Sequence, residues 1–268
     1  EGFTRNRRWG YDTGAREAAG ETPAVDPALW VMRVDRGDGS PLALLAHFAA
    51  HPTILGHENM ALSAEWPGVL QRELEEAFPG AAALFVNGAL GDQSPAGARG
   101  RDGFEKVADY GARLARLAAE TAREIDTAPG ARIGFARGTP RLPEFRFTEK
   151  AQSRYGRFLD AALEALPRTA EIQVLRIGSA ALVGLPGEPL LEVGQAVREK
   201  VAEQGFQDVV VLGLANDYIG YIVNEKEYAH GGYEVDSRSY YGPGLGAFVA
   251  RQAGRVARDA AGATAAAE

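Results

Sequence analysis

Short runs of apolar residues recur along the chain, and each run is bounded by residues typical of turns. The runs cover residues 41–50, 82–86, 180–185 and 209–214. Aliphatic runs of this length predict buried β-strands. Each predicted strand leads into a polar or glycine-rich loop, and these loops read HPTILGHEN, NGALGDQSP, PGEP and ANDYIGY.

Apolar residues at a spacing of three or four predict helices over residues 65–78 and 104–125. Pro189 suits the first turn of a third helix, and a fourth is expected over residues 245–261. Three further segments are predicted as a helix (148–166), a β-hairpin turning at Gly178 and Ser179 (171–185) and an irregular stretch (132–146). The alternation indicates an α/β fold with mixed β-sheets flanked by helices.

Polar side chains collect where the predicted strands end. They are His51 after the first strand, Asn87, Asp92 and Ser94 after the second, Glu188 after the third, and Asn216, Asp217, Tyr218 and Tyr221 after the fourth. In open α/β sheets, ligands bind beyond the carboxyl ends of the strands. We therefore expect the functional site at these ends.

Composition narrows the function classes. With 268 residues and 46% hydrophobic content, the chain can form one α/β domain or two small ones, and we favour a single domain over residues 1–268. The net charge of -7 and the pI near 5.3 argue against a nucleic-acid partner. No apolar stretch approaches the length of a membrane-spanning helix, which predicts a soluble protein, either cytoplasmic or secreted.

The chain contains no cysteine, so a bound metal ion would need histidine, carboxylate or phenolate ligands. His51 leaves a buried strand before a Pro-Thr pair, where it could bind metal or simply hydrogen-bond a carbonyl. Glu188 lies between a strand and a helix start, where a carboxylate ligand and an ordinary first-turn glutamate look alike. Ser94 precedes a proline in a loop, and no GxSxG elbow supports it as a nucleophile.

Taken together, the loops resemble the neutral/alkaline, non-lysosomal ceramidase family. The matching pieces are NRR at 6–8, HFAAHPT at 47–53, NGALGDQSP at 87–95, LPGEP at 185–189 and ANDYIGYIVNEKEYAHGGYE at 215–234, followed by YYGP. They occur in the family's order and span nearly the whole chain. The ordered set is more specific than any single piece.

The resemblance implies a zinc-dependent hydrolase that uses metal-activated water to cleave the amide bond of a lipid or another N-acyl compound. By position, it implies His51, Glu188 and Tyr221 as metal ligands. It also implies that Tyr233 helps to hold the substrate carbonyl and that Arg7 lines the site. Ser94 matches a serine of the family for which a nucleophile role has also been argued.

One motif of the family is absent from the chain. The family's other zinc histidine and its general base come from a His-x-His-Ser-Gly motif that precedes the Asn-Arg motif. We therefore expect the domain to be incomplete at its N-terminus. Its N-terminal part is either cut off, removed, or present as a separate segment that stays docked to the chain and completes the site. Whether His57 or His230 replaces the absent ligand stays open, and His230, near Tyr233, is the better placed.

Two other functions remain as alternatives. A metal-independent serine hydrolase would use Ser94, and chelation of metal would leave its activity unchanged. A non-catalytic ceramidase-like binding domain would bind no metal at all.

Overall fold

The computed structural model describes residues 2–11, 13–156 and 159–263, and it divides the chain into two compact units. Unit 1 comprises residues 1–6, 25–87 and 93–130, and unit 2 comprises residues 7–24, 88–92 and 131–268. Both units are assembled from separate stretches of the chain. The expectation of a single catalytic domain over residues 1–268 stays a prediction.

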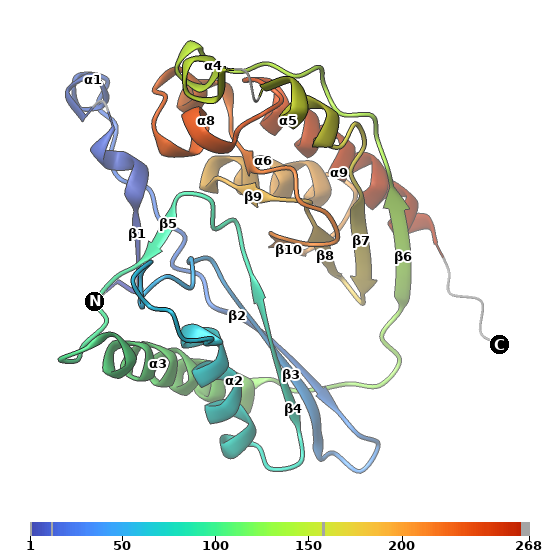
Figure 1. Ribbon diagram of the computed structural model, residues 1–268. Coiled ribbons are helices and arrows are strands. Elements are labelled where there is room, and N and C mark those ends of the chain that lie inside the picture. The colour runs from blue at the N-terminus through green and yellow to red at the C-terminus, as the bar shows by residue number, and fades with distance from the viewer. Residues whose placement is uncertain (1, 12, 157–158, 264–268) are drawn as a thin grey trace. The chain divides into compact units, whose positions relative to one another are not determined.

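Unit 1 contains a three-stranded sheet and two helices. Its strands are β1 (Thr4–Asn6), β2 (Trp30–Asp35), β3 (Pro41–Phe48), β4 (Ala82–Asn87) and β5 (Gln93–Pro95), and its helices are α2 (Glu65–Ala77) and α3 (Gly103–Glu124). The sheet has the order β2-β3-β4, with β2 antiparallel and β4 parallel to β3, while β1 and β5 form an antiparallel pair. Helices α2 and α3 pack side by side (Figure 1).

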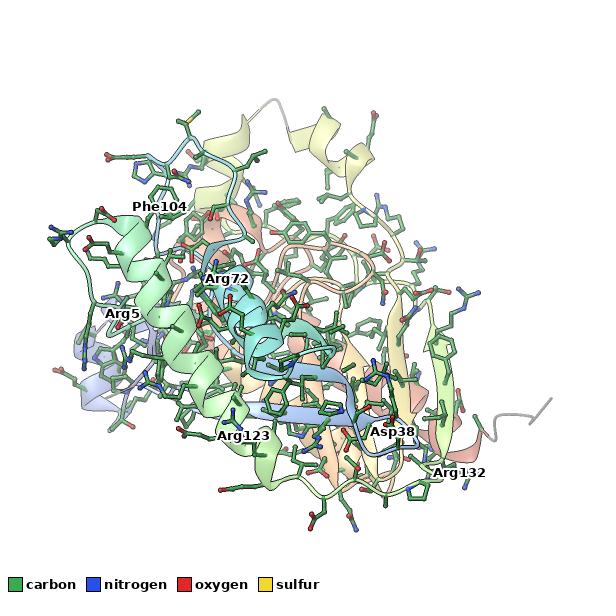
Figure 2. All side chains as sticks on the ribbon, turned by 90° about the horizontal axis from the view of Figure 1, so that it is seen from below. Arg5, Asp38, Arg72, Phe104, Arg123 and Arg132 are labelled. Atoms are coloured by element: carbon green, nitrogen blue, oxygen red, sulfur yellow. The ribbon has the colours of Figure 1, made fainter. Side chains whose placement is uncertain are left out.

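The core of unit 1 follows from the helical spacing of its apolar residues. Leu70 and Leu74 of α2 and Leu114 of α3 are fully or almost fully buried. Charged residues occupy the opposite sides of the two helices, where Arg72 and Arg123 are exposed (Figure 2). This division of apolar and charged faces holds both helices on the sheet.

Unit 2 contains a four-stranded mixed sheet with helices around it. Its strands are β6 (Ile133–Gly138), β7 (Ile172–Ile177), β8 (Ala180–Gly184), β9 (Glu188–Pro189), β10 (Asp208–Leu212) and β11 (Tyr221–Ile222). Its helices are η1 (Arg7–Gly10), α1 (Thr13–Ala18), α4 (Glu149–Tyr155), α5 (Leu159–Ala165), α6 (Leu191–Ala202), α7 (Glu225–Ala229), α8 (Tyr233–Arg238) and α9 (Leu245–Gly262).

The order of the main sheet in unit 2 is β10-β8-β7-β6, and only the pair β10-β8 is parallel. Helix α9 packs against β6, β7 and α6 (Figure 1). The buried strand β8 turns from β7 at Gly178, whose φ of 62° favours glycine. The predicted hairpin and the predicted fold class, mixed β-sheets flanked by helices, are both confirmed.

Four local predictions were wrong. Pro189, expected in the first turn of a helix, lies in strand β9, and α6 begins only at Leu191. The helix expected over residues 148–166 is two helices, because Gly156 ends α4 with a φ of 45°. The stretch 132–146, expected to be irregular, contains β6, an edge strand whose alternating exposure is typical of a half-buried strand. The strand expected over 209–214 ends at Leu212, since Leu214 has a left-handed φ of 57°.

Among the residues that the structure describes, no helix has both the length and the apolar character needed to cross a membrane.

Candidate functional site

Glu188 and Tyr221 lie opposite each other on two short parallel strands of unit 2. The chain leaves the parallel neighbours β8 and β10 and then forms β9 and β11, in which Glu188 is in register with Tyr221. The Glu188 backbone N–H donates to the Gly220 carbonyl at 3.0 Å. Gly187 permits this approach, because a Cβ there would collide with the Gly220 carbonyl. The sheet thus places a carboxylate and a phenol side by side.

The Glu188 carboxylate is only 8% exposed and accepts a hydrogen bond from the Tyr218 hydroxyl at 2.6 Å. Burial raises the pKa of Tyr218, and the bond to Glu188 adds to the increase. Tyr218 is therefore a neutral phenol whose O–H donates a hydrogen bond to Glu188. Sequence analysis placed Tyr218 among the polar residues at the strand ends but gave it no role.

Tyr221 is 5% exposed, and its hydroxyl accepts a hydrogen bond from Arg7 Nη2 at 2.9 Å. Burial raises the pKa of Tyr221; Arg7 opposes this increase and the Glu188 carboxylate adds to it. Tyr221 is consequently a neutral phenol at neutral pH. A cation between Glu188 and Tyr221 would reverse this preference, because it would stabilise both the carboxylate and the phenolate.

Arg7 is held at several points of its guanidinium group. Nη2 donates to the Tyr221 hydroxyl and also to the Gly91 carbonyl at 2.8 Å, while Nε donates to Glu234 Oε1 at 2.7 Å. Of the residues predicted to line the site, Arg7, Glu188 and Tyr221 are therefore brought together in unit 2.

Tyr233 belongs to the same group of side chains. It is the first residue of α8, is 51% exposed, and its ring lies edge-on to the Tyr221 ring with a centroid distance of 6.1 Å. An exposed phenol next to a buried one gives this face of unit 2 a polar group that a substrate can reach.

His51 lies in unit 1, three residues beyond the end of β3, and is 8% exposed. Its Nδ1 lies 2.9 Å from the Gln93 carbonyl, which can only accept a hydrogen bond. The proton of the neutral imidazole is therefore on Nδ1, and the lone pair is on Nε2. This is the arrangement in which a histidine binds metal through Nε2.

Ser94 also lies in unit 1, in the middle of β5, where it pairs with Arg5 of β1. Its carbonyl accepts a hydrogen bond from Thr4 Oγ1 at 3.2 Å. Asp92, which precedes Ser94 by two residues, accepts a hydrogen bond from the Leu191 backbone N–H at the start of α6. Asp92 therefore supports the helix that follows Glu188.

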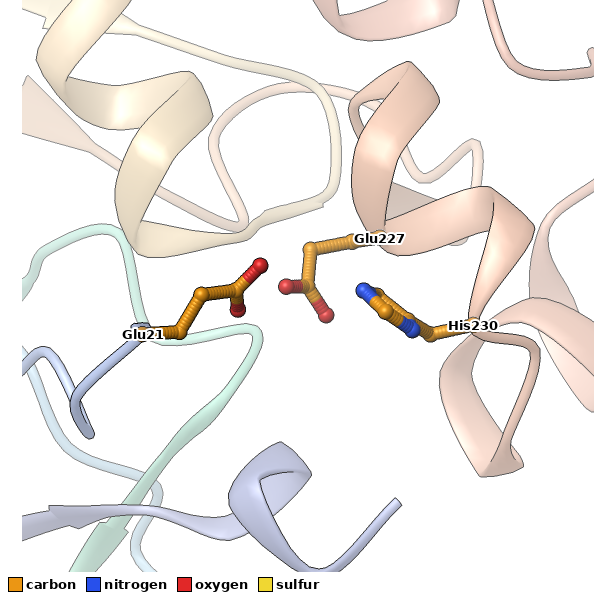
Figure 3. A group of neighbouring side chains, drawn as sticks. All are labelled: Glu21, Glu227 and His230. Carbon is orange, nitrogen blue, oxygen red and sulfur yellow. The ribbon is translucent and has the colours of Figure 1, made fainter. Parts of the chain in front are cut away.

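Sequence analysis left His57 and His230 open as replacement ligands. His57 is exposed in the loop between β3 and α2. His230 lies in unit 2 with Glu21 and Glu227, and the potential ligand atoms of the three are within 4.8 Å of one another (Figure 3).

Positively charged side chains already neutralise this group. Glu227 accepts hydrogen bonds from Arg8 at 2.7 Å and Arg16 at 2.6 Å, and Glu21 forms ion pairs with Arg16 and Lys226. A divalent cation would be repelled by these three side chains. The group around His230 is thus an ion-pair cluster, and its residues do not fit a metal site.

Residues 154–249 match the family model described as "Neutral/alkaline non-lysosomal ceramidase, N-terminal". Among curated proteins, the neutral ceramidase of Mycobacterium tuberculosis is 38% identical over 69 residues, which is 25% of this chain and 11% of that protein. The neutral ceramidase of Pseudomonas aeruginosa is 37% identical over 81 residues, covering 29% of this chain and 12% of that protein.

Two solved structures share the fold. A crystal structure of neutral ceramidase from Pseudomonas aeruginosa matches with a TM-score of 0.76 at 21% identity, covering 96% of this chain and 50% of that one. A structure described as "Ceramidase complexed with C2" matches with a TM-score of 0.73 at 20% identity, covering 100% and 54%. The chain therefore spans about half the length of these proteins.

Proposed function

Because the chain belongs to the neutral/alkaline non-lysosomal ceramidase family, we propose that it is a zinc-dependent hydrolase that cleaves the N-acyl amide bond of a lipid. The observation that supports this proposal best is the pairing of Glu188 with Tyr221, held by Arg7, at the ends of β8 and β10. This arrangement combines a metal-ligand carboxylate with a phenol in a nearly solvent-free environment.

The chemistry of each proposed ligand is compatible with zinc, as judged from its surroundings within its own unit. Unit 2 offers the buried Glu188 carboxylate and the adjacent Tyr221 oxygen, and unit 1 offers His51 in the tautomer with its lone pair on Nε2. Carboxylate oxygen and imidazole nitrogen are ordinary zinc ligands. Zinc, when bound, lowers the pKa of a coordinated water towards about 7 and polarises an amide carbonyl.

The remaining side chains orient groups and stabilise charge. Arg7 fixes the position of the Tyr221 hydroxyl and places a positive charge beside it. Tyr218 donates to Glu188 and so fixes the direction in which that carboxylate points. Tyr233, the exposed phenol beside Tyr221, is proposed to donate a hydrogen bond to the substrate carbonyl.

The proposed substrate class is an amide with an apolar acyl chain. Ceramide is one member of this class, and another acylated amine fits as well. The proposal also includes a further histidine from a separate N-terminal segment. Intact-mass and gel analysis of the native sample tests whether this segment is a separate chain that stays bound. If it is, a shorter companion chain should be detected.

The first experiment measures zinc by plasma mass spectrometry and hydrolysis of a short-chain N-acyl amide in parallel. We expect about one zinc per chain, and we expect Glu188→Gln and His51→Ala to weaken zinc binding by at least about tenfold. Matched controls are Glu192→Gln on the neighbouring helix α6 and His57→Ala in the exposed loop of unit 1. Both controls should retain zinc.

Chelation separates the proposal from the serine-hydrolase alternative. EDTA should abolish hydrolysis and added zinc should restore it, while Ser94→Ala should retain most of the activity. If activity survives EDTA and is lost in Ser94→Ala, the serine mechanism replaces the zinc mechanism.

A further inference from the structure

We propose that Glu234 is the positioning residue of the site, because its carboxylate holds Arg7 in the orientation in which Arg7 contacts Tyr221. This inference rests on the proposed function of Tyr221. Glu234 is completely buried in the first turn of α8, directly after Tyr233. A fully buried carboxylate is costly unless its oxygen atoms are paired with positive charges.

Each oxygen of Glu234 accepts a hydrogen bond from a different arginine. Oε1 accepts from Arg7 Nε and Oε2 accepts from Arg8 Nη1, both at 2.7 Å. The carboxylate is planar and charged, so these two short bonds fix both its rotation and the position of each guanidinium group. Glu234 therefore joins two arginines that are neighbours in the sequence.

The bond to Arg7 Nε determines where the rest of that guanidinium group points. The group is planar, and its Nη2 donates to Tyr221 and to the Gly91 carbonyl. Rotation about the Arg7 side chain would break all three contacts together. Arg7 is also the more exposed partner of Glu234, with 22% of its side chain accessible, and of the three groups that it contacts here Glu234 is the charged one.

The hydrogen bond from Arg8 holds the other oxygen of the Glu234 carboxylate. Arg8 is 1% exposed, and its other N–H groups donate to Glu227 Oε2 and to the carbonyls of Glu227 and Gly231. Glu227, the buried carboxylate in Figure 3, also accepts from Arg16. This network extends away from Tyr221, so its outer members provide controls that leave the Arg7 bond intact.

The test compares Glu234→Gln with the matched control Glu227→Gln. Both changes remove one buried negative charge that pairs with Arg8, but only the first also removes the negative charge that pairs with Arg7. For hydrolysis of an N-acyl amide, we expect Glu234→Gln to lower kcat by about 10- to 100-fold with KM changed less than about threefold. We expect Glu227→Gln to lower kcat by less than about threefold.

A double-mutant cycle with Arg7→Ala adds a readout that a purely structural role would not produce. In the Arg7→Ala background, Glu234→Gln should cause almost no further loss of kcat. The proposal would be overturned if Glu234→Gln and Glu227→Gln lost the same factor in kcat at matched folded fraction. It would also be overturned if the effects of Arg7→Ala and Glu234→Gln on kcat simply multiplied in the double variant. If Glu234→Gln does not fold, Glu234→Asp replaces it, since this variant keeps the charge but shortens the reach to Arg7.

Nuclear magnetic resonance of arginine Nε–H groups separates this inference from the proposed function. The Arg7 Nε–H, assigned by its loss in Arg7→Lys, should exchange slowly in the wild-type chain and in Glu227→Gln, and rapidly in Glu234→Asp. If that pattern holds while no amide is hydrolysed, the proposed function fails and the positioning of Arg7 stands. If amides are hydrolysed but the Arg7 signal is the same in all variants, the positioning role is wrong.

Discussion

The two units hold their candidate side chains by different physical means. In unit 1, His51 is fixed by a backbone carbonyl and by the aromatic core beneath it. In unit 2, Glu188 is fixed by the Tyr218 phenol, and Tyr221 is fixed by Arg7, which forms an ion pair with the buried Glu234. Packing of apolar side chains does not depend directly on pH, whereas the stability of an ion-pair network does. The two units should therefore lose stability under different conditions.

The contrast is clearest in the most deeply buried side chains. In unit 1 the largest is Trp66, whose ring meets Phe48, Phe85 and Tyr110 edge-on and whose Nε1 donates to the His51 carbonyl at 3.2 Å. In unit 2 the largest is Arg8, a charged residue. Aromatic packing contributes to folding by burial of apolar area, while a buried ion pair contributes mainly to the orientation of its members.

Trp66→Ala should have the largest effect on stability. Removal of the fully buried ring leaves a cavity and deletes the hydrogen bond to the His51 carbonyl, which should cost about 4 kcal/mol of unfolding free energy. The measurement is urea unfolding, with hydrogen exchange of peptides from each unit as the local readout. Trp66→Phe, which keeps a ring, should lose clearly less.

The loss of protection should be concentrated in the peptides of unit 1. If peptides of unit 2 lose protection to the same extent, the two units are not energetically distinct and the comparison between them fails.

As the pH falls, unit 2 should lose stability before unit 1. Burial alone would raise the pKa of the Glu227 carboxyl, but the hydrogen bonds from Arg16 and Arg8 outweigh it and lower the pKa from 4.5 to about 2. Because the pKa is lower in the folded state, this stabilisation is complete above about pH 4.5 and is lost as the pH falls towards 2. The loss amounts to about 3 kcal/mol at most.

The measurement is the unfolding free energy at several values between about pH 6 and pH 2. Glu227→Gln has no titrating group at this position, so its stability should depend less steeply on pH than that of the wild type. An identical pH dependence in the two proteins would show that the ion pairs of Glu227 do not contribute to acid sensitivity.

Much of the fold could be predicted from periodicity, because the main strands and helices are apolar at regular spacing. Helices α2, α3 and α9 lie within a few residues of the predicted ranges, and α6 begins two residues after Pro189. The missed elements lack this signal. Strand β6 is an exposed edge strand, and α7 and α8 are short helices in a glycine-rich stretch. Helix α7 carries a local signal in its N-cap Asn224, whereas β6 and α8 depend on tertiary contacts.

The candidate site was only partly visible in the sequence. Glu188 and Tyr221 were among the polar residues that follow predicted strands, but only the family resemblance implied a shared role for them. The structure places them in register. The role of Glu234 could not be seen, because nothing local links it to Arg7 and Arg8 more than 220 residues earlier in the chain. The double arginine at positions 7 and 8 was the only hint that buried carboxylates were required.

The smallest predicted effect concerns two residues with left-handed backbone conformations, one in each unit. Glu65 in unit 1 has a φ of 54° and Leu214 in unit 2 has a φ of 57°, and such angles cost about 1–2 kcal/mol in a residue other than glycine. Glu65 is held by its side chain, which accepts from the backbone N–H groups of Leu55 and Trp66. Leu214 is half exposed and is held by its backbone N–H, which donates to the Gly187 carbonyl at 2.8 Å.

Substitution by glycine should therefore have opposite effects in the two units. Leu214→Gly relieves strain and should raise the unfolding free energy by up to about 1 kcal/mol, whereas Leu214→Ala keeps the Cβ and should give no gain. Glu65→Gly relieves the same strain but deletes two hydrogen bonds of a buried carboxylate, so it should lower the unfolding free energy by about 2 kcal/mol. Urea unfolding of the three variants provides the test. A gain in both glycine variants would mean that the Glu65 carboxylate does not stabilise unit 1, because its bonds to Leu55 and Trp66 would then be worth less than the strain.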